Sequence, residues 1–219
     1  MRTMLTSGTP VELAVVPGAA RGLVVAPDIG GLRPLFDDMA ASLAEQTGRS
    51  VACVEPWPNH QFAEGDIAAR LAAVHELHDL RVVGDLVAAA ELLGCNDVGL
   101  IGFCMGGMYV HKASASGRFN RLVSFYGMIE LPDDWAGPGQ SEPLAALAQL
   151  TTPSAELAII GELDPYTPPA ALARLRATGV SVATYPEAGH GFVHAPDRPD
   201  HRPDDAADAW RRALAHLES

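Results

Sequence analysis

One cysteine between glycines is the side chain of this sequence best placed to act as a nucleophile. Segment 102–106 reads Gly-Phe-Cys-Met-Gly, follows the apolar run 98–101 and precedes a run of small residues. It matches the nucleophile elbow G-x-S-x-G with cysteine in place of serine, since a sharp turn from strand to helix needs glycine on both sides. We therefore expect Cys104 to be a nucleophile. The alternative is an unreactive buried cysteine in a glycine-rich turn.

Two further residues follow Cys104 in the order that such a catalytic triad requires, acid and then histidine. Asp164 comes just after the apolar run 155–161, with Glu162 as the second choice of acid. His190 lies between two glycines after the alternating run 180–185. A turn or a helix cap is the structural alternative for Asp164.

These three residue types can perform acyl transfer. A free thiol has a pKa of about 8.5, so a neighbouring imidazole is needed to take its proton at neutral pH. Asp164 would orient His190, and the thiolate of Cys104 would attack an ester-like carbonyl. The oxyanion would accept hydrogen bonds from the amides of Met105 and Ile29, the latter in the glycine-rich loop after the run 22–26.

Other residues are expected around this centre. Asp28 is a candidate for modulating the thiol, because a carboxylate would raise its pKa or hold its proton; an Asx turn is the equal alternative. Trp57 follows a predicted strand and Tyr126 ends another, at the edge where ligands bind in open α/β folds, although Trp57 suits core packing equally well. The substrate pocket is also expected to include Phe192 and His194, just after His190.

The chain resembles the dienelactone hydrolase family of α/β-hydrolases. The resemblance rests on segments 26–31, 84–86, 98–107, 124–127, 161–164 and 188–192, which span nearly the whole sequence. It implies hydrolysis of a lactone or ester by Cys104, Asp164 and His190, with no metal or cofactor.

The chain also departs from that family's pattern. The type enzyme has glutamate where this chain has Asp28, and there the glutamate pairs with the resting thiol. Its two substrate-binding arginines align near Ile67 and at His194, neither of which is arginine here. Four other arginines are candidates to replace them: Arg70, Arg81, Arg198 and Arg202.

Short apolar strands alternate with alanine-rich helices along the sequence. This pattern predicts a mostly parallel sheet with helices on both faces, as in the α/β-hydrolase fold, which would position these residues. Residues 1–219 are expected to form one domain. Strands are predicted at 11–16, 22–26, 50–54, 98–103, 122–126, 156–160 and 180–185. Helices are predicted at 34–46, over 66–93 with Gly84 as a candidate break, and at 105–116, 169–177 and 204–217. Segment 127–153 is predicted to be irregular, either a lid or pocket wall or a surface excursion.

The composition of the chain limits the classes of molecule that it is expected to bind. The net charge of −12 argues against nucleic acid, and no apolar run is long enough to span a membrane. Three cysteines without a framework spacing favour a reducing compartment, so we expect a cytoplasmic monomer or homodimer that acts on a small ester or lactone. An enzyme for thioesters or carbon–carbon bonds could use the same triad. The alternative from another class is a thiol protein that responds to redox state or captures electrophiles without turnover.

Overall fold

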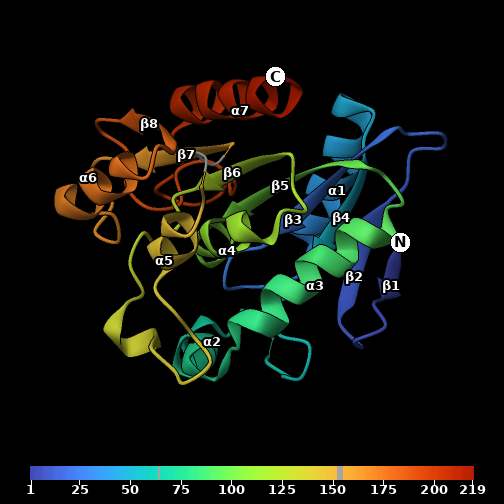
Figure 1. Cartoon of the computed structure of the whole chain (residues 1–219), viewed down its shortest axis with the longest axis horizontal. Coiled ribbons are helices and arrows are strands. Elements are labelled where there is room, and N and C mark those ends of the chain that lie inside the picture. Colours follow the sequence, from blue (N-terminus) through green and yellow to red (C-terminus); the bar gives the residue numbers. More distant parts are fainter. Residues whose placement is uncertain (64, 152–154) are drawn as a thin grey trace.

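Eight strands form the central sheet of the computed structural model, which describes residues 1–63, 65–151 and 155–219 (Figure 1). Across the sheet they are β1 (Arg2–Met4), β2 (Pro10–Ala14), β4 (Ser50–Val54), β3 (Arg21–Ala26), β5 (Asp97–Phe103), β6 (Arg121–Phe125), β7 (Glu156–Gly161) and β8 (Ser181–Tyr185). β1 runs antiparallel to β2 and β2 antiparallel to β4, whereas the strands from β4 to β8 are parallel. The carboxyl ends of the parallel strands therefore meet at one edge.

Helices cover both faces of the sheet (Figure 1). On one face lie α1 (Pro34–Thr47) and α7 (Pro203–Glu218); on the other lie α3 (Asp79–Leu92), α4 (Met105–Ala113), α5 (Pro143–Ala148) and α6 (Pro169–Ala177). Alternate strand residues divide between the two cores: Leu23 and Val25 pack towards α1 and α7, and Val24 packs on the opposite side. This two-sided burial explains why the central strands are almost continuously apolar.

The predicted α/β-hydrolase architecture is confirmed, and its strands and helices lie close to their predicted bounds. One break was misplaced. α2 (Ile67–Ala73) and the 3-10 helix Val74–Glu76 precede α3, so the interruption lies at residues 77–78. Gly84 lies inside α3, where its Cα faces open space and one glycine is tolerated.

Other elements were not predicted. β1 is an additional edge strand. The predicted helix at 105–116 ends as α4 at Ala113 and continues as the 3-10 helix Ser114–Ser116. Segment 127–153 contains α5 and the 3-10 helix Asp133–Trp135, while residues 152–153 of that prediction lie outside the described residues.

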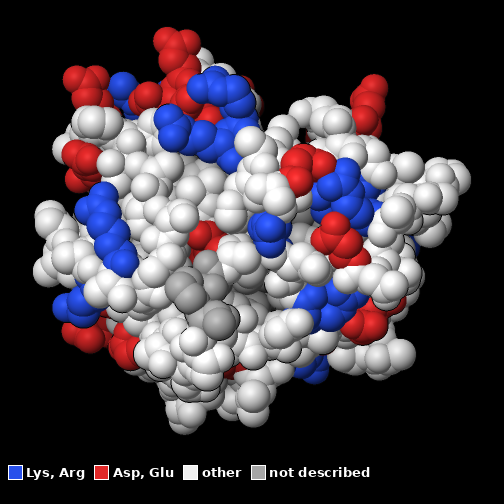
Figure 2. Space-filling view, turned by 45° about the horizontal axis from the view of Figure 1, so that its top comes forward, with Lys and Arg blue, Asp and Glu red and all other residues white. Residues whose placement is uncertain are grey.

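The surface carries charges of both signs. On the face shown in Figure 2, acidic and basic side chains lie in small mixed groups, so the net charge of −12 is not concentrated there. Within the described ranges, no helix combines the length and apolar composition needed to cross a bilayer.

Candidate active site

The turn between β5 and α4 holds Cys104 in a strained backbone conformation. Its φ is 54° and its ψ is −116°, a region that residues with a side chain rarely occupy. A Cβ on Gly102 would lie 2.3 Å from the carbonyl oxygen of Gly106, and a Cβ on Gly106 would lie 2.1 Å from that of Ala26. The two glycines therefore allow strand and helix to approach closely, which is the reason for the G-x-C-x-G pattern.

This turn also places an amide beside the thiol. Met105 is the first residue of α4, so its N–H has no acceptor within the helix. Cys104 is itself held by a hydrogen bond from its N–H to the carbonyl of Phe125, with an N–O distance of 3.0 Å. The helix terminus thus offers a donor and a favourable dipole to negative charge near Cys104.

Asp164 and His190 meet beyond the carboxyl ends of β7 and β8. Nδ1 of His190 lies 2.8 Å from Oδ2 of Asp164. The other carboxylate oxygen of Asp164 accepts a hydrogen bond from the amide of Tyr166 at 2.9 Å. Glu162, the second choice of acid, is exposed, whereas Asp164 is buried.

The surroundings of His190 favour its protonated form. Burial alone would lower the pKa of the imidazole. Hydrogen bonds with Asp164 and Cys104, together with the negative charges of both groups, outweigh burial and raise the pKa of His190 to about 10. The ring lies hydrogen-bonded to the carboxylate and on the same cavity wall as Cys104.

A cavity of about 340 Å3 opens onto this centre. Cys104, His190 and Ile29 all line it. Three arginines, Arg33, Arg70 and Arg198, also line it and give its wall a positive character. Ile67, which aligns near one of the family's arginines, lies on the same wall as Arg70, one helical turn away in α2.

Asp28 belongs to a buried hydrogen-bond network beside the cavity. Arg33 donates to both of its carboxylate oxygens, at 2.7 and 2.8 Å, and Nε2 of His194 lies 2.7 Å from Oδ2. Burial would raise the pKa of Asp28, but the hydrogen bonds from His194 and Arg33 hold it well below its usual range. The hydrogen bonds found among the described residues therefore engage Asp28 with Arg33, His194 and the amide of Gly30, and a direct effect on the thiol stays a prediction.

The network fixes the tautomer of His194. Burial lowers the pKa of His194 despite the opposing charge of Asp28, so the ring is neutral. Nε2–H then donates to ionised Asp28, and Nδ1 accepts the hydroxyl hydrogen of Tyr126. Burial raises the pKa of Tyr126 well above its ordinary value, so the phenol keeps this proton.

The four residues expected in the substrate pocket lie at different places relative to the cavity. His194 lines the cavity. Trp57 and Phe192 do not, because both rings are buried in the hydrophobic cores. Tyr126, also buried, lies behind the wall, with its ring 5.3 Å from that of His190. The prediction that Trp57, Tyr126 and Phe192 line the cavity is therefore wrong.

Tyr166 and Arg33 are among the cavity residues that sequence reasoning missed. Tyr166 follows Asp164 by two positions, and its ring lies 5.0 Å from that of His190. Arg33 precedes Pro34 at the start of α1 and reaches the cavity through its ion pair with Asp28. One signal in the sequence could have identified Arg33: it lies close to Ile29, in the loop predicted to provide the second oxyanion donor.

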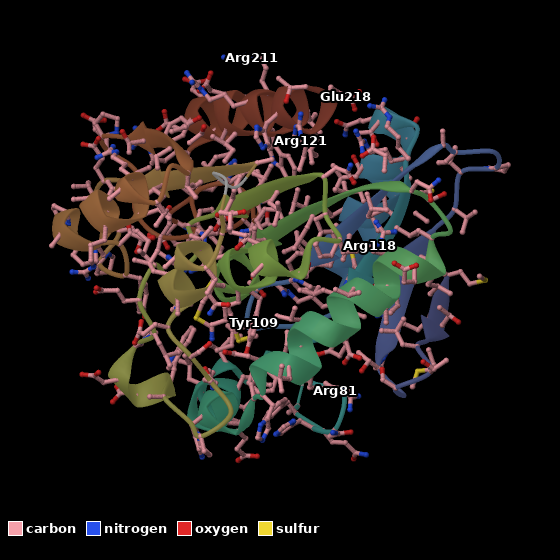
Figure 3. The ribbon with its side chains drawn as sticks, in the orientation of Figure 1. Arg81, Tyr109, Arg118, Arg121, Arg211 and Glu218 are labelled. Atoms are coloured by element: carbon pink, nitrogen blue, oxygen red, sulfur yellow. The ribbon has the colours of Figure 1, made fainter. Side chains whose placement is uncertain are left out.

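Of the four arginines considered as replacements, two reach the cavity. Arg81 extends from α3 (Figure 3) and pairs with Asp85 at 2.7 Å, outside the cavity wall. Arg202 pairs with Asp205 at the start of α7. Arg70 and Arg198 remain at the site.

The sheet order, the elbow and the loops at the carboxyl ends of the strands define an α/β-hydrolase fold. The model of the dienelactone hydrolase family matches residues 11–219, so the chain belongs to that family.

Two relatives with curated names are similar to this chain over most of its length. A Bradyrhizobium protein named "Probable 2-oxo-3-(5-oxofuran-2-ylidene)propanoate lactonase" is 29% identical over 216 residues, covering 93% of this chain and 85% of the relative. "Carboxymethylenebutenolidase 2" of Cupriavidus pinatubonensis is 30% identical over 202 residues, covering 84% of this chain and 79% of the relative.

Solved structures show the same fold. A protein from Klebsiella pneumoniae, provisionally assigned as a dienelactone hydrolase, superposes with a TM-score of 0.83 at 22% identity, covering 100% of this chain and 98% of the other. A dienelactone hydrolase-like promiscuous phosphotriesterase from metagenomic libraries gives a TM-score of 0.75 at 18% identity, with coverage of 100% and 96%.

Proposed function

We propose that the protein hydrolyses a carboxylic ester or lactone through a Cys104, His190 and Asp164 triad. The observation that carries the proposal is the 2.8 Å contact between Asp164 and His190, which lines the same cavity as the thiol of Cys104 at its strained elbow. Membership of the dienelactone hydrolase family and the names of the two relatives support the same reaction.

The reaction proceeds in two balanced halves. The thiolate of Cys104 attacks the carbonyl carbon, and the oxyanion accepts hydrogen bonds from the amides of Met105 and Ile29. Collapse breaks the acyl C–O bond, and the alkoxide takes the proton of the His190 imidazolium. His190 then removes a proton from a water molecule as the water oxygen attacks the thioester. Collapse of this second tetrahedral intermediate breaks the C–S bond and releases the carboxylic acid, which leaves the thiolate of Cys104 beside the imidazolium of His190.

A substrate panel of lactones, aryl esters and carboxylate-bearing esters tests this mechanism. We expect Cys104→Ala to abolish hydrolysis and Cys104→Ser to keep weak activity, because the geometry survives. Cys95→Ala, which changes a buried cysteine outside the cavity, is the matched control and should keep wild-type rates. Full activity of Cys104→Ala would remove the thiol from the mechanism. Stoichiometric modification of Cys104 without turnover would favour the electrophile-capturing alternative.

We further propose that the substrate carries a carboxylate bound by Arg70 and Arg198. Within the described residues, Nε of Arg70 is buried without a hydrogen-bond partner, and its guanidinium lies over the ring of Phe62 at 4.7 Å. The guanidinium of Arg198 lies beside Gly191, so that a Cβ there would be 3.5 Å from Nη1. Both cations line the cavity, and the names of both relatives describe substrates with a carboxyl group.

Arg70→Gln should raise KM for a carboxylate-bearing ester and leave KM for a neutral ester unchanged. A hydrogen bond to a charged group contributes about 1.5–3 kcal/mol, so the expected rise is about tenfold or more. The pair 4-nitrophenyl hydrogen succinate and 4-nitrophenyl butyrate measures the difference. Arg211→Gln on the exposed side of α7 is the control. An equal change in KM for both esters would contradict a carboxylate contact.

A further inference from the structure

In the loop between β3 and α1, the backbone N–H groups of residues 30–32 are hydrogen-bonded, whereas that of Ile29 has no acceptor among the described residues. The N–H groups of Gly30, Gly31 and Leu32 donate to Oδ1 of Asp28 at 2.8 Å, to the carbonyl of Asp28 at 3.0 Å and to Oε2 of Glu55 at 2.9 Å. In the stretch 29–32, the amide of Ile29 alone donates to no other described residue. Ile29 lines the catalytic cavity, so this N–H is available to an oxyanion there.

The carbonyl of Ile29 accepts a hydrogen bond from a buried side chain. The indole Nε1–H of Trp57 donates to it at 2.8 Å. The ring of Trp57 is buried, and the ring of Phe62 packs edge-on against it at 5.3 Å, so the donor has little freedom to move. This hydrogen bond holds the peptide plane that follows the Cα of Ile29, because a carbonyl shares its plane with the amide of the next residue. The Ile29 N–H shares its own plane with the carbonyl of Asp28, which accepts from the amide of Gly31 at 3.0 Å. With both planes held, rotation of the Ile29 backbone is limited, and so is the direction of its N–H.

Glu55 joins the backbone of Trp57 to the loop. One carboxylate oxygen accepts from the amide of Leu32 and the other from the amide of Trp57, both at 2.9 Å. Gly31, with φ of +66°, lies directly on this carboxylate, and a Cβ there would be 2.5 Å from Oε1. The loop is therefore held at Ile29 and at Leu32 by two residues that follow β4.

We propose that Trp57 and Glu55 are positioning residues that orient the Ile29 amide as the second oxyanion donor. This inference rests on the proposed function. Neither residue lines the catalytic cavity, so each acts through the loop and not on the substrate. An oxyanion donor accelerates a reaction because it is oriented before charge develops, and a loop free to rotate would lose that advantage.

Trp57→Phe keeps the aromatic ring and removes the indole donor. Loss of a whole oxyanion donor costs about 100- to 1000-fold in kcat, so loss of its support should lower kcat about tenfold, with KM unchanged. Glu55→Gln keeps the shape and one acceptor oxygen and should give a smaller loss of kcat. Trp210→Phe, a change of the same type on α7, should leave kcat unchanged.

A trifluoromethyl ketone distinguishes positioning from general damage. Its adduct with the thiolate of Cys104 carries an oxyanion, whereas a carboxylate product does not form one. In Trp57→Phe and Glu55→Gln, affinity for the ketone should fall by the same factor as kcat, and affinity for the product should stay at the wild-type value. Thermal unfolding of each variant identifies any that no longer fold.

The outcomes separate the two claims. Wild-type kcat and ketone affinity in both variants would overturn the positioning role and leave the hydrolase intact. An equal loss of ketone and product affinity would also overturn it, because a distorted pocket predicts that result. A wild-type protein that neither hydrolyses the ester panel nor forms the ketone adduct on Cys104 would overturn the proposed function, and this inference with it.

Discussion

The imidazole of His190 is held on three sides before any substrate binds. Asp164 accepts from Nδ1, while the rings of Tyr126 and Tyr166 lie nearly perpendicular to the imidazole at centroid distances of 5.3 and 5.0 Å. Tyr126 is held in turn by its hydrogen bond to His194. These contacts limit rotation of the ring, so the cost of orienting it is met during folding.

Asp164→Asn should lower the pKa of His190 from about 10 towards the ordinary value of about 6.5. The carboxylate that stabilises the imidazolium is then absent. NMR titration of the imidazole measures the shift, with Asp208→Asn on α7 as the control. The kcat of Asp164→Asn should fall at least about a hundredfold. An unchanged pKa of His190 would show that Asp164 does not stabilise the charged ring.

The same shift determines how stability depends on pH. Because the pKa of His190 is raised on folding, its contribution to stability is complete below about pH 6.5 and is lost as pH rises through about 10. Urea unfolding of the wild type and Asp164→Asn at pH 6, 8 and 10 should show a difference that shrinks as pH rises. A difference that grows with pH would contradict the assignment.

At this scale, sequence reasoning depends on positions that the chain marks locally. Glycines on both sides mark Cys104 and His190, and a strand end marks Asp164. It failed for Trp57 and Phe192, because the direction of a side chain after a strand depends on the turn that follows. It missed Arg33 because its approach to the cavity depends on the fold of the Asp28 loop.

At the scale of elements, the contact between β3 and α4 determines whether the elbow forms. Gly106 lies against the carbonyl oxygens of Ala26 and Pro27, where a Cβ would be 2.1 and 2.4 Å away. Backbone atoms cannot move aside as a flexible side chain can. The elbow therefore depends on one missing side chain.

Gly106→Ala should destabilise the protein by about 3 kcal/mol or more, since overpacking at backbone forces the strand and helix apart. Gly84→Ala is the matched control: it lies inside α3 with open space around it, and it should stabilise by about 0.5–1 kcal/mol. Urea unfolding of both variants provides the comparison. A Gly106→Ala protein as stable as the wild type would show that the elbow tolerates a wider separation.

Elements with strong local patterns were predictable, and weak ones were not. β4 was predicted at its observed bounds because five buried residues follow a glycine and precede a proline-rich loop. β1 has only three residues and pairs with β2 alone, at the edge of the sheet. Whether this strand forms depends on β2 and not on a pattern in its own three residues. α5 has six residues, too few for a clear helical period.

At the scale of the whole molecule, Arg49 joins the two ends of the α/β unit. Its guanidinium is buried and donates to the carbonyl of Leu217 at 2.6 Å, to that of Gly22 at 3.3 Å and to Glu218 at 3.0 Å. These contacts attach the end of α7 to β3. We therefore expect the last helix to unfold together with the sheet.

Arg49→Met should destabilise the protein by about 2 kcal/mol or more, because several hydrogen bonds from a charged group are lost. Arg211→Met, which changes an exposed arginine on the outer side of α7 (Figure 3), should alter stability by less than about 0.5 kcal/mol. Chemical unfolding followed by circular dichroism measures both. Equal effects of the two substitutions would show that α7 is not attached through Arg49.

The most direct test of the account is the site of acylation during turnover. The protein is mixed with an activated ester, quenched in acid within the first turnover and digested, and the acylated peptide is identified by mass spectrometry. We predict one acyl group on Cys104, with none on Cys53 or Cys95, and accumulation of this species in His190→Ala. Turnover with an acyl group on any other residue, or with none on Cys104 at any time, would contradict a cysteine nucleophile in this protein.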